Sequence, residues 1–185
     1  MSIRLWAMAV IVAAPLAARA ADEENPYKKV KVGDFATYKM TTKFGDRTVE
    51  GTATQKVTAK DDKEATIKMT VKFNGMEFPG QEQKIDLTKP YDPTKAGLPP
   101  GADVKVEKQK SGTEKLKAGG KEYDCKWETY KFSGKAMGME ISGDVKVWQS
   151  KDLPLQVVKM ESNAAAGGMK FETTMELTEA GSKSD

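Results

Sequence analysis

The sequence predicts an all-β protein, with a single antiparallel sheet of about nine to eleven strands curled into a half-barrel, a barrel or a sandwich. Three observations predict this class. Apolar and polar residues alternate with a period of two along much of the chain, turn residues separate the alternating segments, and no segment shows a helical stripe. One-sided strands of this kind are typical of antiparallel sheets with one face on a core and the other in water.

The clearest element is a hairpin. In Glu64–Phe73 every second residue is apolar, and the positions between them carry Glu, Thr or Lys. Asn74-Gly75 follows, the dipeptide best suited to the two positive φ angles of a tight turn. The alternation resumes in Met76–Phe78, and Pro79-Gly80 then predicts a bulge or a break.

Further strands are expected wherever the same alternation recurs. They span residues 34–44, 48–59, 83–87, 102–110, 113–116, 121–132, 139–149, 155–161 and 169–177. Residues 88–101 contain four prolines and predict one long connection, which is either a rigid connector or a lid or binding loop.

One predicted strand has aromatic residues on both faces. Tyr123, Cys125 and Trp127 share a face, whereas Tyr130 and Phe132 have the opposite parity. Either bulges switch the faces of this strand, or the strand makes apolar contacts on both sides.

Residues 1–20 have the organisation of a secretory signal peptide. Arg4 gives a basic start, an apolar run spans Leu5–Leu16, and Ala18-Arg19-Ala20 has the small-x-small pattern of a cleavage site. The apolar run is shorter than the roughly 20 residues that a membrane helix needs. We therefore expect cleavage after Ala20 and an exported protein, periplasmic or secreted, with no transmembrane segment after cleavage.

Cleavage would leave 165 of the 185 residues, which suits one domain. We expect a flexible start at residues 21–27, a β domain over residues 28–180 and a disordered tail at residues 181–185. Loss of Arg4 and Arg19, with no acidic residue in the signal, lowers the formal net charge from +3 to +1. Arg47 is then the only arginine. Because bidentate recognition of phosphate favours arginine, no nucleic-acid binding is expected.

The composition argues against an enzyme. Histidine is absent from the sequence, which removes the commonest general base, the Ser-His and Cys-His nucleophiles and most zinc and copper(II) sites. The 27 acidic residues are scattered over polar strand faces, so no pair is singled out for glycoside hydrolysis. We predict no catalytic residue, no metal site and no cofactor.

The sulfur-containing residues leave alternatives open. Cys125 is the only cysteine, so we expect a buried, inert thiol, with a reactive thiol or an intermolecular disulfide as the alternatives. Met137 and Met139 place two thioethers on one strand face, an arrangement that suits copper(I). Methionines on apolar strand faces are expected to fill the core.

The segment Lys146–Lys159, in which Trp148 closes one strand and Leu153-Pro154-Leu155 opens the next, resembles an element of exported, uncharacterised β domains. Gly120–Lys126 is similar to the strand that precedes this element there. The resemblance covers mainly residues 119–177. Such domains resemble the open half-barrel sheets of periplasmic lipoprotein carriers, so the resemblance implies an exported domain of that architecture.

Two functions are expected. The first is a non-enzymatic structural or interaction domain of the cell envelope, with an envelope protein as its partner. The alternative is a carrier or binding module for an apolar ligand, such as a lipid or an acyl chain, in the concave face of the sheet. The pocket would then be lined by Met69, Val71, Phe73, Trp127, Met139 and Trp148. A filled interior favours the interaction domain, and an open one favours the carrier.

Overall fold

The computed structural model describes residues 25–90, 103–136 and 138–183. The predicted signal peptide with its cleavage site, most of the predicted long connection and Met137 lie outside the described residues.

Nine strands form one sheet, after a short 3-10 turn at Pro26–Lys29. The strands are β1 (Asp34–Phe44), β2 (Arg47–Lys60), β3 (Glu64–Phe73), β4 (Met76–Asp86), β5 (Asp103–Ala118), β6 (Lys121–Ala136), β7 (Met139–Gln149), β8 (Val157–Ala166) and β9 (Met169–Ser182). Every neighbouring pair of strands is antiparallel. The predicted all-β class with a single antiparallel sheet is confirmed.

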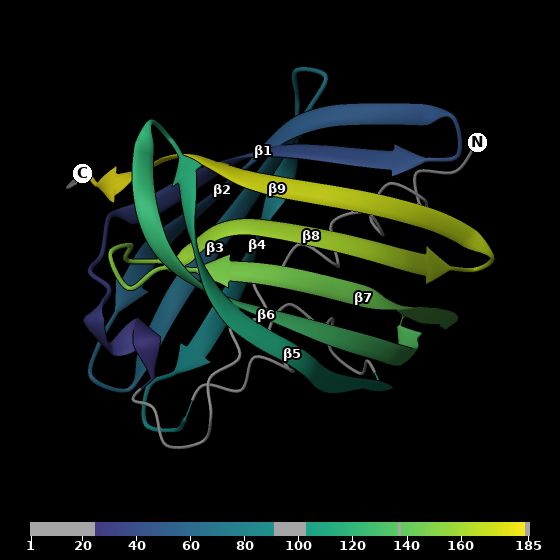
Figure 1. Ribbon diagram of the computed structural model, residues 1–185. Helices are drawn as coiled ribbons and strands as arrows, with labels where there is room; N and C mark the ends of the chain where they lie inside the picture. The colour runs from purple at the N-terminus through teal and green to yellow at the C-terminus, as the bar shows by residue number, and fades with distance from the viewer. Residues whose placement is uncertain (1–24, 91–102, 137, 184–185) are drawn as a thin grey trace.

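The strand order is β4-β3-β2-β1-β9-β8-β7-β6-β5, so two meanders are joined where the first strand pairs with the last. Eight antiparallel pairings lie between β4 and β5, and the two edge strands therefore run in the same direction. No ladder joins β4 to β5 within the described residues, so the sheet is curled but open (Figure 1).

The core lies on one face of the sheet, which we call the inner face. The ladders place Met40, Met175, Met160 and Val147 side by side on this face, and all four are buried. Tyr38 is buried in the next row, where its hydroxyl donates to the Val157 carbonyl at 3.3 Å. Burial raises the pKa of this phenol well above its ordinary value. Large side chains thus fill the middle of the inner face.

The observed strands differ from the predicted ones mainly by merging. β4 runs through Pro79-Gly80, where a register shift against β3 forms a bulge. The predicted strands at 102–110 and 113–116 form the single strand β5, whose register shifts around Gln109. Asn25 and Tyr27 are buried and β9 extends to Ser182, so the packed part is longer than the predicted residues 28–180.

The free ends of β5 and β6 form a two-stranded arm, residues 111–125. The β5–β6 ladder continues to Ala118↔Lys121, whereas the β6–β7 ladder stops at Lys126. The arm crosses the outer face of the sheet and reaches β9 (Figure 1). At its turn, Gly119 lies against the backbone of Thr178.

The arm explains the aromatic residues on both faces of β6. The β6–β7 register has no shift, so no bulge switches the faces. Tyr130 and Phe132 lie on the inner face. Tyr123 and Cys125 are buried on the opposite side, the side on which the arm meets the sheet. Of the two alternatives in the sequence, apolar contacts on both sides are the correct one.

We predict that Gly119→Ala lowers the free energy of unfolding by about 2–4 kcal/mol, measured by urea unfolding. Gly119 has a φ of 55°, in the left-handed region, and an added Cβ would lie 2.9 Å from the Thr178 carbonyl oxygen. The control is Gly120→Ala, where φ is 77° and nothing lies within 4 Å of an added Cβ. This control should cost about 1 kcal/mol. Equal losses for the two variants would show that the turn does not rest on β9.

Candidate functional site

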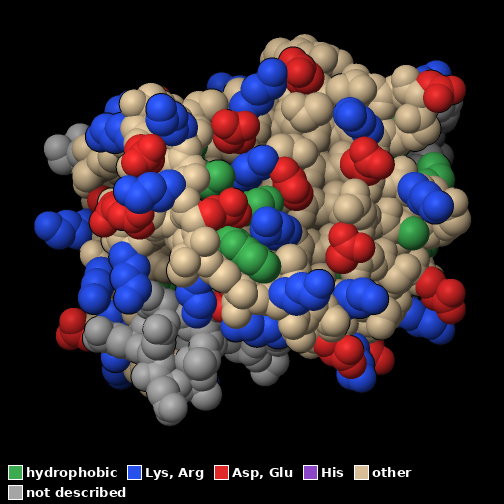
Figure 2. Space-filling model, viewed as in Figure 1, with side chains coloured by type: hydrophobic (Ala, Val, Ile, Leu, Met, Phe, Trp, Pro, Cys, Tyr) green, Lys and Arg blue, Asp and Glu red, His purple; other side chains and the backbone are tan. Residues whose placement is uncertain are grey.

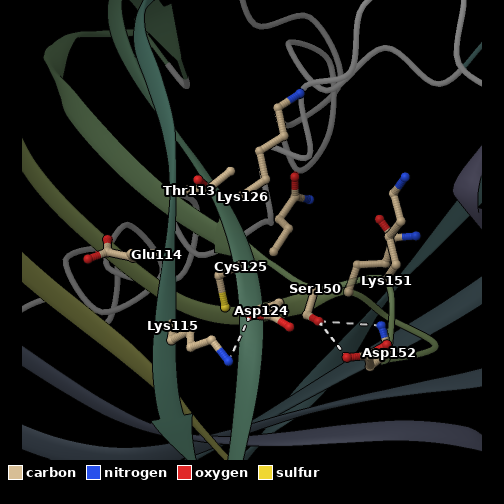
Figure 3. Close-up of a pocket in the computed structure, with 11 residues that line it drawn as sticks. Thr113, Glu114, Lys115, Asp124, Cys125, Lys126, Ser150, Lys151 and Asp152 are labelled. Atoms are coloured by element: carbon tan, nitrogen blue, oxygen red, sulfur yellow. Dashed lines mark hydrogen bonds and ion pairs between the residues drawn. The ribbon is translucent and has the colours of Figure 1, made fainter.

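The arm and the β7–β8 connection form an open groove of about 610 Å³, which we call the arm groove (Figure 3). It is lined by Thr113, Glu114, Lys115, Asp124, Cys125, Lys126, Gln149, Ser150, Lys151, Asp152 and Gln156. One wall is present because β5 and β6 run past the end of β7. The other wall is the connection, which the buried side chains of Leu153 and Leu155 hold to the core. The polar and charged lining suits a polar ligand or partner.

Opposite charges are paired across the arm. Lys115 lies 3.4 Å from Asp124 and 3.4 Å from Glu122, and Figure 3 shows Lys115 and Asp124 facing each other. Attraction to these carboxylates, Asp124 first, raises the pKa of Lys115. Lys151 forms no ion pair with the residues that the structure describes. The Lys151 side chain is exposed.

Two glutamines lie at the ends of the β7–β8 connection: Gln149 is the last residue of β7, and Gln156 directly precedes β8. Gln156 has a φ of 60°, in the left-handed region that residues other than glycine rarely adopt. The turn is held by hydrogen bonds from the Ser150 N–H to the Gln156 carbonyl (2.8 Å) and from the Gln156 N–H to the Leu153 carbonyl (3.2 Å). Gln149 Nε2 is buried and has no hydrogen-bond partner within the described part of the chain. A buried donor without an acceptor is costly, so an acceptor brought into the groove would stabilise it.

The thiol of Cys125 is not arranged as a nucleophile. It is buried and unpaired, and it lies 3.6 Å from the Tyr123 carbonyl, to which it donates. Burial and the nearby Glu114 carboxylate raise the pKa of Cys125 to about 11. Because the thiolate is the reactive form, such a thiol is inert at neutral pH.

A buried carboxylate lies next to the groove. Glu128 has a side chain only 2% exposed, and it contacts Lys108 at 2.5 Å and Lys126 at 3.1 Å. It also accepts a hydrogen bond from the Tyr130 hydroxyl. Burial alone would raise the pKa of Glu128, but the hydrogen bonds from Lys108, Tyr130 and Lys126 outweigh it and hold the pKa below its usual range. The carboxylate is therefore ionised and fully paired, as a structural group rather than a general acid.

Contacts around Trp148 fasten the arm to the outer face. The indole N–H of Trp148 donates to Glu114 of the arm, and Lys146 lies 3.5 Å from the same carboxylate. The Lys146 ammonium is 4.5 Å from the ring centroid of Trp127 and 4.2 Å from that of Trp148. Cation–π contacts of this kind stabilise a partly desolvated cation. Gly112 lies directly against the Trp127 ring, where no side chain would fit.

The six residues predicted to line an apolar pocket divide between the two faces of the sheet. Met69, Val71 and Phe73 lie on the inner face, and the last two are buried in the core. Trp127 and Trp148 pair with each other on the outer face. Met139 has inner-face parity but is exposed at a hairpin tip. The structure therefore brings together only subsets of the six.

Sequence reasoning missed the arm groove. The available signal was the length of the predicted alternation, since residues 102–132 extend well beyond what the shorter strand at 139–149 can pair with. The alternation does not show where the unpaired part of a hairpin folds, so the groove follows only from the tertiary structure.

The rest of the outer face is chemically mixed. Figure 2 shows Lys and Arg interspersed with Asp and Glu, and a few hydrophobic side chains between them. Within residues 25–90, 103–136 and 138–183, no group of three or more Cys, Asp or Glu residues is placed to hold a metal ion. The same residues contain no helix that is long and apolar enough to cross a membrane.

Two solved structures resemble this one. The first is a protein of Bacteroides fragilis assigned as exported, with a YmcC-like fold; the TM-score is 0.50 at 11% identity, over 82% of this chain and 96% of that one. The second is a protein of Parabacteroides distasonis assigned as a lipoprotein, with a TM-score of 0.50 at 9% identity and the same coverage of both chains. The chain shares their fold. No family model and no curated protein sequence matches it.

At these identities the similarity concerns the fold alone. It agrees with the predicted resemblance to exported, uncharacterised β domains. The relation to lipoprotein carriers, which the sequence also suggested, stays a prediction.

We predict that Cys125 reacts with an aromatic disulfide reagent at pH 8 at least a hundredfold more slowly in the folded protein than in urea. The reason is the combination of burial with a pKa of about 11, which leaves little thiolate. The absorbance of the released thiol measures the rate. Equal rates in the folded and unfolded states would contradict the buried position.

We predict that the protein loses stability as the pH falls below about 4.3, the ordinary pKa of a glutamate. The folded-state pKa of Glu128 is depressed, so the stability from its ion pairs is complete above the unfolded-state pKa and is lost as the pH falls through the folded-state value. Urea unfolding between pH 7 and pH 3 measures this change. Glu128→Gln should be less stable at pH 7 and should show a smaller loss towards pH 3; an unchanged pH slope in this variant would contradict the assignment.

Proposed function

We propose that this protein is an exported, non-enzymatic interaction domain of the cell envelope, which contacts its partner at the arm groove. The observation that carries the proposal is that the interior of the sheet is filled, whereas a groove beside the arm is open. The middle of the inner face is filled by Tyr38, Met40, Met160 and Met175, whereas the arm groove is open to solvent.

The groove has features that a polar partner would satisfy. Gln149 Nε2 lacks an acceptor, and Lys151 lacks a counter-ion within the described residues. Gln156 holds a strained backbone conformation in the connection that also contains Lys151. The inert Cys125 and the absence of histidine from the sequence support a role in binding rather than in catalysis.

A second candidate, a carrier for an apolar ligand, is favoured by a different observation. Towards the tips of the β6–β7 and β8–β9 hairpins, the inner face is only partly covered. Met139 is 36% exposed and Met169 is 42% exposed, and Ile141 and Phe171 are half-buried. An apolar ligand has access to the inner face at this end, and not in the filled middle.

The test of the proposal is photo-crosslinking in the native cell. A photoreactive amino acid at Lys151, in the groove, should give a discrete crosslinked product, because a partner would lie against this side chain. The matched control is Lys68, an exposed lysine in the middle of β3, far from the groove lining, which should give none. Identical products at both positions would contradict a specific contact at the groove.

Native mass spectrometry of the exported protein, purified without detergent, tests whether the protein holds a tightly bound, enclosed ligand. The interaction domain should give the bare polypeptide mass. A lipid that stays bound throughout purification would instead make the protein a carrier with an enclosed ligand, and would overturn the proposal.

A further inference from the structure

The inner face has an apolar strip at the hairpin-tip end that is separate from the main core. The ladders place Phe171, Ala164, Gly143 and Phe132 side by side across β9, β8, β7 and β6. The β1–β9 ladder reaches Lys43↔Glu172, so Phe44 of β1 continues this row next to Phe171. Phe132 is buried but lies outside the core cluster. The row is thus an apolar surface of its own.

A second apolar row lies closer to the tips. Met169, Ala166, Ile141 and Gly134 are paired in succession across β9, β8, β7 and β6. The two rows together form the strip. We define the strip as Phe44, Phe132, Ile141, Ala164, Met169 and Phe171, with Gly134, Gly143 and Ala166 between them. Of the six named side chains, Phe44, Ile141, Ala164 and Phe171 are half-buried and Met169 is exposed. The strip is therefore an apolar surface that solvent can reach.

On the core side, a polar row bounds the strip. Thr42, Thr173 and Ser162 are neighbours across β1, β9 and β8. The hydroxyls of Thr42 and Thr173 are 3.2 Å apart and bonded to each other, whereas Ser162 Oγ is buried without a partner within the described residues. A ligand on the strip would therefore meet polar groups on one long side and the exposed methionines on the other.

A cationic side chain, Arg47, lies at the β2 end of the row. Arg47 pairs with Phe44 in the last step of the β1–β2 ladder and so has the same inner-face parity. It is exposed and forms no ion pair with the residues that the structure describes. It is also the only arginine beyond the predicted signal peptide. A guanidinium group at the end of an apolar row is complementary to an anionic head on an apolar chain, because it binds carboxylate or phosphate oxygens through two hydrogen bonds.

The length of the row fits one such chain. From β2 to β7 the row crosses four strand spacings, or about 19 Å at about 4.8 Å each. One acyl chain fills half of a bilayer's hydrocarbon core, which is about 15 Å. A chain of this length with its head at Arg47 would cross three strand spacings and reach the small residue Ala164 on β8.

We propose that the strip binds a free, single-chain anionic amphiphile, such as a long-chain carboxylate, with its head on Arg47 and its chain along the Phe44–Phe171–Ala164–Gly143 row. This inference rests on the second candidate function and names its ligand class. Because the strip is open to solvent, binding is reversible, and a purified sample releases the ligand.

The test is calorimetric titration of the exported protein with oleate below its micelle concentration. We expect binding of one oleate per chain, and a weakening of about ten- to a hundredfold in Arg47→Gln, the loss expected for a charged hydrogen bond. The matched control is Lys43→Gln. Lys43 belongs to the same hairpin but has outer-face parity, so this variant should bind oleate like the wild type. Both side chains are exposed, so neither change should impair folding.

Two further measurements distinguish the ways in which the proposal can fail. Oleyl alcohol has the same chain without the charge and should bind as weakly as oleate binds to Arg47→Gln. If both compounds bind equally and Arg47→Gln has no effect, the anionic class is overturned while an apolar-ligand carrier stands. If neither compound binds, the carrier candidate fails as well. Cosedimentation with phosphatidylglycerol vesicles tests the other source of anionic acyl chains, and binding to vesicles without binding of monomeric oleate would overturn the proposal.

Discussion

The pairing of β1 with β9 is the interaction on which the rest of the structure depends. Each meander alone, β1–β4 or β5–β9, would leave an unpaired edge and an apolar face in water. In the β1–β9 pairing, Tyr38 lies opposite Leu177 and Met40 lies opposite Met175. These four residues are among the most buried of the described residues. Burying each such side chain contributes about 1.5–3 kcal/mol, which is why the first and last strands lie at the centre of the sheet.

Because β1 pairs with β9, the two edge strands of the sheet are β4 and β5. Because these strands run in the same direction, a hairpin cannot close the sheet between them. Both edges have features that discourage pairing with other chains. β4 has a bulge, and β5 has a register shift and five lysines. The sheet can therefore remain open without presenting a flat edge.

The openness produces two surfaces of different chemistry at opposite ends of the strands. At the end where β7 stops and β8 begins, the arm folds over Trp148 and creates a polar groove. At the hairpin-tip end, where β6 and β8 end, the inner face continues beyond the main core as an apolar strip beside Arg47. The filled middle, with Met40, Met160 and Met175, separates the two. Binding at one surface thus needs no rearrangement of the other.

The sequence by itself determined the class of the fold and most of its strands. The bounds of β1, β3 and β7 follow from alternation and from turn residues such as Asn74-Gly75, because local backbone preferences and side-chain parity act within a few residues. Tertiary structure alone decided the joint between β1 and β9, the position of the arm and the assignment of Trp127 and Trp148 to the outer face. These features depend on contacts between residues far apart in the chain, as between Glu114 and Trp148, and a period of two is the same for either face of a strand.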